Sequence, residues 1–179
     1  MALTLRGLVG VLFGLVAMSW RMTLGEFALL FGAYVFLDGV LAVAAGLRDG
    51  DNLMVGWTFV LEGMIGVALG VLVWAAPGVP RWPISFVAIW AILTGALELI
   101  AAGSLARWRA GSIFVGLAGI SSVVLGMLLL ELPVADAAAI QGWLGIYALV
   151  FGAAMLAASL GPRRRHGVVR HRRSTMKAA

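Results

Sequence analysis

Long apolar stretches separated by short polar breaks run along the whole chain. A bilayer core takes about 20 helical residues, and six stretches reach roughly that length. They cover residues 3–20, 25–47, 53–75, 83–105, 111–131 and 137–160. Because the breaks between them are so short, neighbouring helices must run antiparallel. This pattern predicts an all-α integral membrane protein with six transmembrane helices.

The same pattern of glycines and aliphatic residues recurs three times, 56 residues apart. The stretches LRGLVGVLFG from Leu5, LEGMIGVALG from Leu61 and LAGISSVVLG from Leu117 align without gaps. The helix that follows each of them also aligns, the third after a slip of one residue. Each unit contains two spans, so every copy has the same orientation in the membrane. We therefore predict three repeated helical hairpins in a pseudo-three-fold arrangement, at approximately 5–50, 54–106 and 111–160.

The repeat also bears on the first span. Residues 17–19, Ala-Met-Ser, resemble a weak cleavage site, which would make this span a signal peptide. Its alignment with the other copies instead favours a span that remains in the mature domain. We expect residues 1–161 to form one six-helix transmembrane domain and residues 162–179 to form a disordered basic cytoplasmic tail.

Positive charge is divided unevenly between the two predicted faces of the membrane. Eleven Lys and Arg residues lie on the side that holds both termini, and two lie on the other side. This excess predicts that the N- and C-termini are cytoplasmic. Arginines near an anionic leaflet add about 1 kcal/mol of binding each, and no aromatic interleaving indicates nucleic-acid binding. The expected lipid-headgroup contacts are Arg163, Arg164, Arg165, Arg170, Arg172 and Arg173.

Glycines follow a helical period in several spans. Positions 63, 66 and 70 have the spacing i, i+3 and i+7, which places them on one face of a helix. Small residues on such a face let helix backbones approach closely, which matters because lipid provides no hydrophobic drive between helices. A glycine-lined pore is the alternative reading. The expected helix-packing residues are Gly7, Gly14, Gly39, Gly63, Gly66, Gly70, Gly95, Gly119 and Gly126.

Three acidic residues, Asp38, Glu62 and Glu98, lie well inside apolar spans. Each is about nine residues from the predicted cytoplasmic end of its span, a depth of roughly 13 Å. We therefore expect them to share one layer in the cytoplasmic half of the bilayer. Arg6 is the repeat equivalent of Glu62 and could reach into that layer. A charge at the bilayer centre costs about 2.5–3.5 kcal/mol on insertion scales, so these acids need a physical explanation.

Three readings of the acidic residues stay open. They are structural if they are protonated, or paired with Arg6 and loop arginines, and hydrogen-bond adjacent helices. They are functional if they form a proton- or cation-responsive cluster whose protonation biases the packing. A transport path is the third reading. The third repeat carries Ala118 and Met155 where the others carry Glu62 and Glu98, and this asymmetry weakens a symmetric central pore.

Composition narrows the chemistry further. Hydrophobic residues make up 63% of the chain and charged residues 12%, against about 25% charged in soluble domains. Cysteine is absent and both histidines, His166 and His171, lie in the tail, so no metal or haem site is expected in the apolar body. Phosphate-binding loops, His-Glu-x-x-His and Gly-x-Ser-x-Gly motifs are also missing. We expect no enzymatic activity and no cofactor.

The stretch WTFVLEGMIGVALG from Trp57, the Pro77 that follows it, and GALELIAAG at 95–103 carry a family likeness. With them the sequence resembles the HdeD-like acid-resistance membrane proteins over residues 5–160. The resemblance implies a six-span bacterial inner-membrane protein linked to acid or general stress tolerance, and it implies little about mechanism. A small transporter or channel for ions or small solutes is one alternative. Another is an assembly partner of a second membrane protein, or a homo-oligomer.

Overall fold

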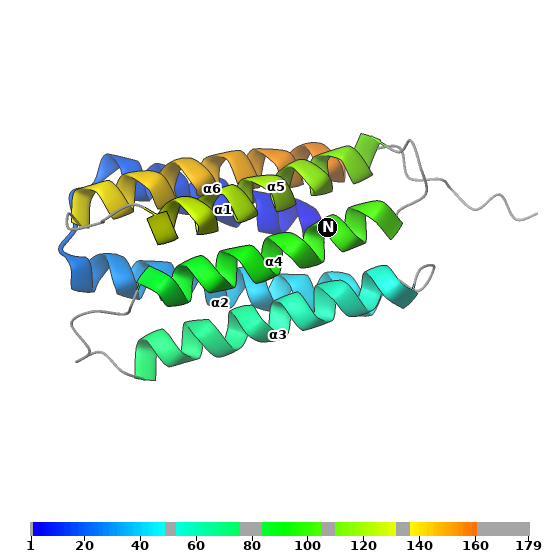
Figure 1. Cartoon of the computed structure of the whole chain (residues 1–179), viewed down its shortest axis with the longest axis horizontal. Coiled ribbons are helices and arrows are strands. Elements are labelled where there is room, and N and C mark those ends of the chain that lie inside the picture. The colour runs from blue at the N-terminus through cyan, green and yellow to red at the C-terminus, as the bar shows by residue number, and fades with distance from the viewer. Residues whose placement is uncertain (1, 49–52, 76–83, 105–109, 132–136, 161–179) are drawn as a thin grey trace, which may run out of the picture.

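The computed structural model describes residues 2–48, 53–75, 84–104, 110–131 and 137–160. These residues form six helices, each within one residue of a predicted span at either end: α1 (Ala2–Ser19), α2 (Leu24–Arg48), α3 (Leu53–Ala75), α4 (Ile84–Ser104), α5 (Ala110–Glu131) and α6 (Ala137–Ser159). All six are long and apolar enough to cross a membrane. The predicted all-α, six-span fold is confirmed, and Figure 1 shows the helices aligned side by side as one bundle.

A capping box fixes the start of α2. The Thr23 backbone N–H and hydroxyl both donate to the Glu26 carboxylate at 2.9 Å, and the Glu26 N–H donates back to the Thr23 hydroxyl at 3.3 Å. Reciprocal bonds of this kind satisfy backbone donors that a helix N-terminus leaves free. The short turn after α1 therefore ends at Thr23, and α2 returns antiparallel to α1.

The helices contact one another in a closed ring, in chain order, with α6 packed back against α1. Closely packed and less closely packed helix pairs alternate around this ring, and glycines lie at the closely packed contacts. A Cβ added at Gly39 of α2 would lie 2.7 Å from the Gly63 carbonyl oxygen of α3. A Cβ at Gly95 of α4 would lie 2.6 Å from the Gly119 carbonyl oxygen of α5. Only glycine fits at such backbone contacts.

A glycine contact of the same kind joins α1 to α6 and closes the ring. A Cβ at Gly7 of α1 would lie 2.7 Å from the Gly152 carbonyl oxygen of α6. Gln141 of α6 strengthens this closure, because its amide Nε2 donates to the carbonyl oxygens of Ala17 and Trp20 at the other end of α1. The closest pairs, α2/α3, α4/α5 and α1/α6, thus join neighbouring repeats, while each repeated hairpin packs less closely within itself.

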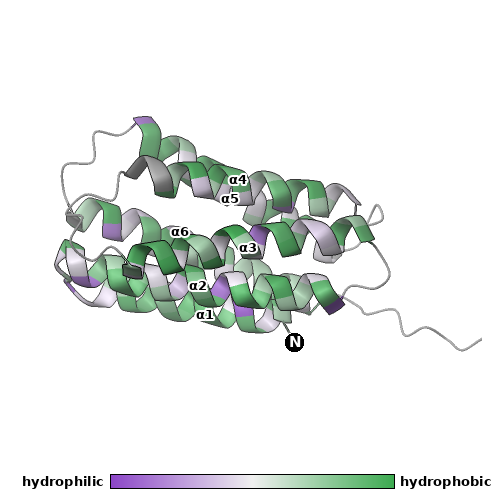
Figure 2. Ribbon diagram, turned by 90° about the horizontal axis from the view of Figure 1, so that it is seen from below, coloured by the Kyte–Doolittle hydropathy of each residue, from purple (hydrophilic) through white to green (hydrophobic). Residues whose placement is uncertain are grey.

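The outer surface of the ring is apolar and repeats with the same period. Leu8, Met64 and Ile120 are equivalent in the three copies and are 45%, 60% and 52% exposed. Figure 2 shows hydrophobic residues along almost the full length of every helix. Such a surface belongs in lipid, since hydrocarbon solvates it and water does not.

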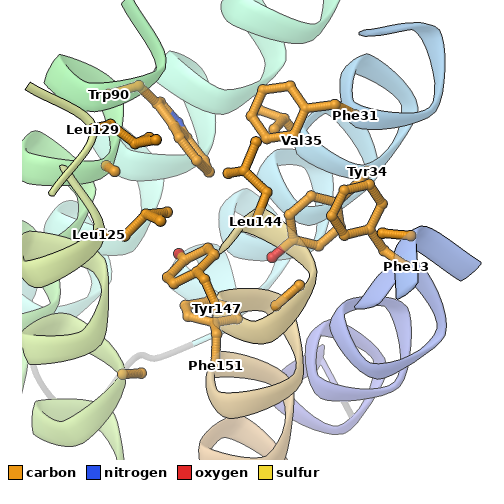
Figure 3. Close-up of a cluster of buried hydrophobic side chains, with 14 of the residues drawn as sticks. Phe13, Phe31, Tyr34, Val35, Trp90, Leu125, Leu129, Leu144, Tyr147 and Phe151 are labelled. Atoms are coloured by element: carbon orange, nitrogen blue, oxygen red, sulfur yellow. The ribbon is translucent and has the colours of Figure 1, made fainter. Parts of the chain in front are cut away.

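The interior is filled by two unequal groups of buried hydrophobic side chains. The larger group, the aromatic core, brings together equivalent residues of the three repeats such as Tyr34, Trp90 and Tyr147. Figure 3 shows these side chains converging from several helices. The smaller group, the thin cap, lies toward the end at which α1 begins. The aromatic core includes Phe13, Phe27, Phe31, Tyr34, Leu69, Trp90, Leu125, Leu129, Leu144 and Tyr147; the thin cap consists of Val55, Phe59, Ala101, Val115 and Ala158.

A buried ionic layer as the candidate functional site

Arg6 of α1 lies at the centre of the bundle and has no exposed surface. Its Nε donates to Asp38 Oδ1 and its Nη2 to Asp38 Oδ2, both at 2.9 Å. Two parallel bonds of this type are the strongest arrangement that an arginine makes with a carboxylate. The pair connects α1 to α2 inside the membrane-spanning part of the molecule.

The other two acids approach the same nitrogen. Arg6 Nη2 also donates to Glu62 Oε1 of α3, and it lies 3.7 Å from Glu98 Oε1 of α4. One guanidinium therefore meets carboxylates from three further helices. We call Arg6, Asp38, Glu62 and Glu98 the ionic layer. The structure brings together all four residues that the sequence placed at one depth.

All four residues of the ionic layer come from the first two repeats, because the third repeat supplies apolar residues at the equivalent positions. Ala118, Phe151 and Met155 are all buried there. The Phe59 and Phe151 ring centroids lie 5.8 and 5.4 Å from Arg6 Cζ. Aromatic faces at this distance attract a guanidinium. Arg6 is thus surrounded by carboxylates and by the faces of two rings.

Several polar atoms of the ionic layer make no hydrogen bond to the described residues. They are Arg6 Nη1, one oxygen of Glu62 and both oxygens of Glu98. The Ser122 hydroxyl lies close to Glu98, yet it donates to the Ala118 carbonyl at 3.1 Å and shares a 2.9 Å hydrogen bond with the Tyr147 hydroxyl. Full ionisation of one arginine and three acids would give this buried layer a net charge of −2.

The remaining predicted residues fall into two groups. All nine predicted helix-packing glycines lie in the described helices, each with backbone or side-chain atoms where a Cβ would stand. The tail arginines lie outside the described residues. Arg48, one of the loop arginines expected to help neutralise the acids, is exposed. In the described part of the chain no group of His, Cys, Asp and Glu has the arrangement to hold a metal ion.

Sequence reasoning missed two polar features, the Ser122–Tyr147 pair and the Gln141 closure of α1 onto α6. Among the described residues, each occurs in the third repeat only. Ser122 replaces a glycine of the other copies, at positions 10 and 66. A polar residue that interrupts an otherwise repeated small-residue pattern was the available signal.

Comparison with known families supports the repeat found in the sequence. The family model described as "Short repeat of unknown function (DUF308)" matches residues 5–75, 61–131 and 117–171. The matches begin 56 residues apart. The first two each reach into three consecutive helices, whereas the third covers residues of α5 and α6 and extends into the tail that was predicted to lie outside the shared pattern. Searches of curated proteins and of solved structures return no match. Because the three matches together cover most of its length, this multi-pass membrane chain belongs to the DUF308 family of short repeats.

Proposed function

We propose that this membrane protein binds protons at the ionic layer and contributes in this way to acid or general stress tolerance, without enzymatic activity. The observation that carries the proposal is the imbalance of three buried acids around one buried arginine. A buried charge without a partner is costly. Each proton that the layer takes up removes one negative charge and brings the layer closer to neutrality.

The hydrogen bonds of the three acids fall in a graded order, which supports an order of proton uptake. Asp38 accepts two bonds from Arg6, Glu62 accepts one, and Glu98 accepts none from the described residues. A hydrogen bond from a cation stabilises the ionised carboxylate. We therefore expect Glu98 to take the first proton and Glu62 the second, with Arg6 still bonded to Asp38.

Proton uptake at these acids would change how the helices are held together. Arg6 of α1 contacts Glu62 of α3 and lies near Glu98 of α4, so it couples helices that are not neighbours in the ring. Protonation of Glu62 weakens its charge-assisted bond to Arg6. The acid-loaded state thus has a weaker link between α1 and α3, and this change in packing is the response that we propose.

The resemblance to the HdeD-like proteins supports acid tolerance as the setting. The excess of positive residues supports an inner-membrane location with both termini in the cytoplasm, and the basic tail suits anionic lipid headgroups.

A small transporter or channel is less well supported, because the aromatic core fills the interior beyond the ionic layer. Solute or ion flux through purified protein in liposomes would favour that alternative, and co-purification after mild detergent extraction would favour an assembly partner.

Counting protons tests the proposal directly. Purified protein in lipid nanodiscs receives a step from alkaline to acidic pH, and an indicator dye reports the protons taken up per chain. We expect Glu98→Gln and Glu62→Gln each to remove one proton from sites in the layer. Glu131→Gln is the matched control, because Glu131 is an exposed acid at the end of α5. This variant should leave the proton uptake of the ionic layer unchanged.

The cellular part of the proposal has its own test. Cells that carry Glu62→Gln or Glu98→Gln, expressed at the wild-type level, should survive an acid shock less well than cells with the Glu131→Gln control. Unchanged survival at unchanged expression would retire the role in acid tolerance. Proton uptake that is equal in wild type and in both layer variants would retire the proton site itself.

A further inference from the structure

We infer that protons reach the ionic layer from one end of the bundle only, the end at which α1 begins, so that the layer is a one-sided proton site and not part of a path across the membrane. The inference rests on the proposed function. It follows from the unequal thickness of the two hydrophobic groups that enclose the layer.

On the side toward the start of α1, the near side, the enclosure is at most about two helical turns thick, and its innermost residues lie one turn from the acids. Phe59 precedes Glu62 by three residues, and Ala101 follows Glu98 by three, which corresponds to roughly 4.5 Å along each helix. Val55 lies one further turn toward the same end. Arg6 itself is only four residues from the start of α1, or about 6 Å. Phe59 is the one aromatic residue among the buried members of the thin cap, and the partly buried Phe114 packs against them.

On the far side the enclosure is about three turns thick. Ala17 follows Arg6 by eleven residues and Phe27 precedes Asp38 by eleven, and both belong to the larger buried group. Eleven residues correspond to about 16 Å of helix. The rings there pack directly, as Phe13 and Tyr34 do with centroids 4.4 Å apart. A proton would have to cross this thickness between closely packed side chains.

The titratable and hydroxyl groups that interact with Glu98 of α4 are Arg6 on α1, Asp38 and Tyr34 on α2, Glu62 on α3, Ser122 on α5 and Tyr147 on α6. The buried Thr94 hydroxyl, one turn from Glu98 toward the far side, donates to carbonyl oxygens of its own helix. The Ser122 hydroxyl shares a hydrogen bond with the Tyr147 hydroxyl. Tyr147 is 6% exposed and packs against the Phe151 ring with centroids 5.7 Å apart. In the described residues this chain of polar groups therefore ends within the aromatic core.

Two matched cavity variants test the direction of access. Phe59 of the thin cap and Phe31 of the aromatic core are 5% and 4% exposed, so Phe59→Ala and Phe31→Ala remove the same side chain from equally buried positions. Protein in nanodiscs is transferred to heavy water, and infrared spectroscopy follows the rate at which the protonated carboxyl band shifts. We expect Phe59→Ala to speed exchange about tenfold or more, a barrier lowered by about 1.4 kcal/mol. Phe31→Ala should change the rate by less than about twofold, or about 0.4 kcal/mol.

Val115→Ala is the second cap variant, because Phe59 also contacts the Arg6 guanidinium and its loss can affect folding. It should speed exchange in the same direction. Equal acceleration by Phe31→Ala, or no acceleration by either cap variant, would overturn one-sided access while leaving the proton site intact. A protein with no protonated carboxyl band at any pH would instead refute the proposed function.

Discussion

Replacing Arg6 by methionine removes the only cation from the described part of the ionic layer while keeping a long apolar side chain. Three hydrogen bonds to carboxylates are lost, two to Asp38 and one to Glu62. Breaking a buried ion pair by removing one partner costs about 3–5 kcal/mol. The expected loss is therefore a hundredfold to several thousandfold in the ratio of folded to unfolded protein, at about 1.4 kcal/mol for each factor of ten.

The assay is reversible unfolding in mixed micelles, followed by circular dichroism at several pH values. Without Arg6 the folded layer must hold its acids in neutral form, so the folded state binds more protons than the unfolded state does at neutral pH. Stability then rises as pH falls. We expect the difference between wild type and Arg6→Met to be largest at neutral pH and to shrink under acidic conditions.

A second substitution shows whether charge is the cause. Arg6→Met combined with Asp38→Leu removes the acid that depends most on Arg6, so the double variant should be more stable than Arg6→Met alone. A cost for Arg6→Met below about 1 kcal/mol, the range of an exposed ion pair, would refute the reasoning. So would a cost that is the same at neutral and acidic pH.

Three further predictions concern packing and topology. Gly39→Ala should destabilise the protein by about 1–3 kcal/mol, because its Cβ would lie 2.7 Å from backbone atoms of α3. Gly103→Ala, with nothing within 4 Å, should stabilise it by about 0.5–1 kcal/mol. Unfolding in mixed micelles measures both, and equal effects would contradict the close glycine contact between α2 and α3. Gln141→Leu loses two hydrogen bonds that join α6 to α1 and should lower the free energy of unfolding by about 1–3 kcal/mol in the same assay. A neutral effect would show that glycine contacts alone hold α6 against α1. The chain contains no cysteine, so a single introduced cysteine can be labelled with a membrane-impermeant thiol reagent. Thr23→Cys and Leu160→Cys should react from opposite sides of the membrane, Leu160→Cys from the cytoplasm. Labelling of both from the same side would contradict the antiparallel spans.

Much of the fold could be predicted from patterns in the sequence. Each span is a long apolar run ended by charge or proline, and the 56-residue period shows equivalent positions such as Tyr34 and Trp90. The depth of the acids follows from counting residues at a fixed rise per residue. These features depend on one helix at a time, so no knowledge of partners is needed to predict them.

The partners of the helices could not be predicted in the same way. A glycine stripe shows that a face packs closely, but it does not identify the helix that packs there. Gly39 therefore gave no indication that it meets Gly63 of the next repeat and not a residue of its own hairpin. The graded bonds of the ionic layer were also out of reach, because they depend on how far the Arg6 side chain extends across the bundle.

The most direct test of the ionic layer as a proton site is an infrared spectrum of the protein in lipid at neutral pH. Wild type should show the absorption of a protonated carboxyl group, Glu98→Gln should lose it, and Glu131→Gln should keep it. A wild-type spectrum without that absorption, or one that Glu98→Gln leaves unchanged, would contradict the proton on Glu98.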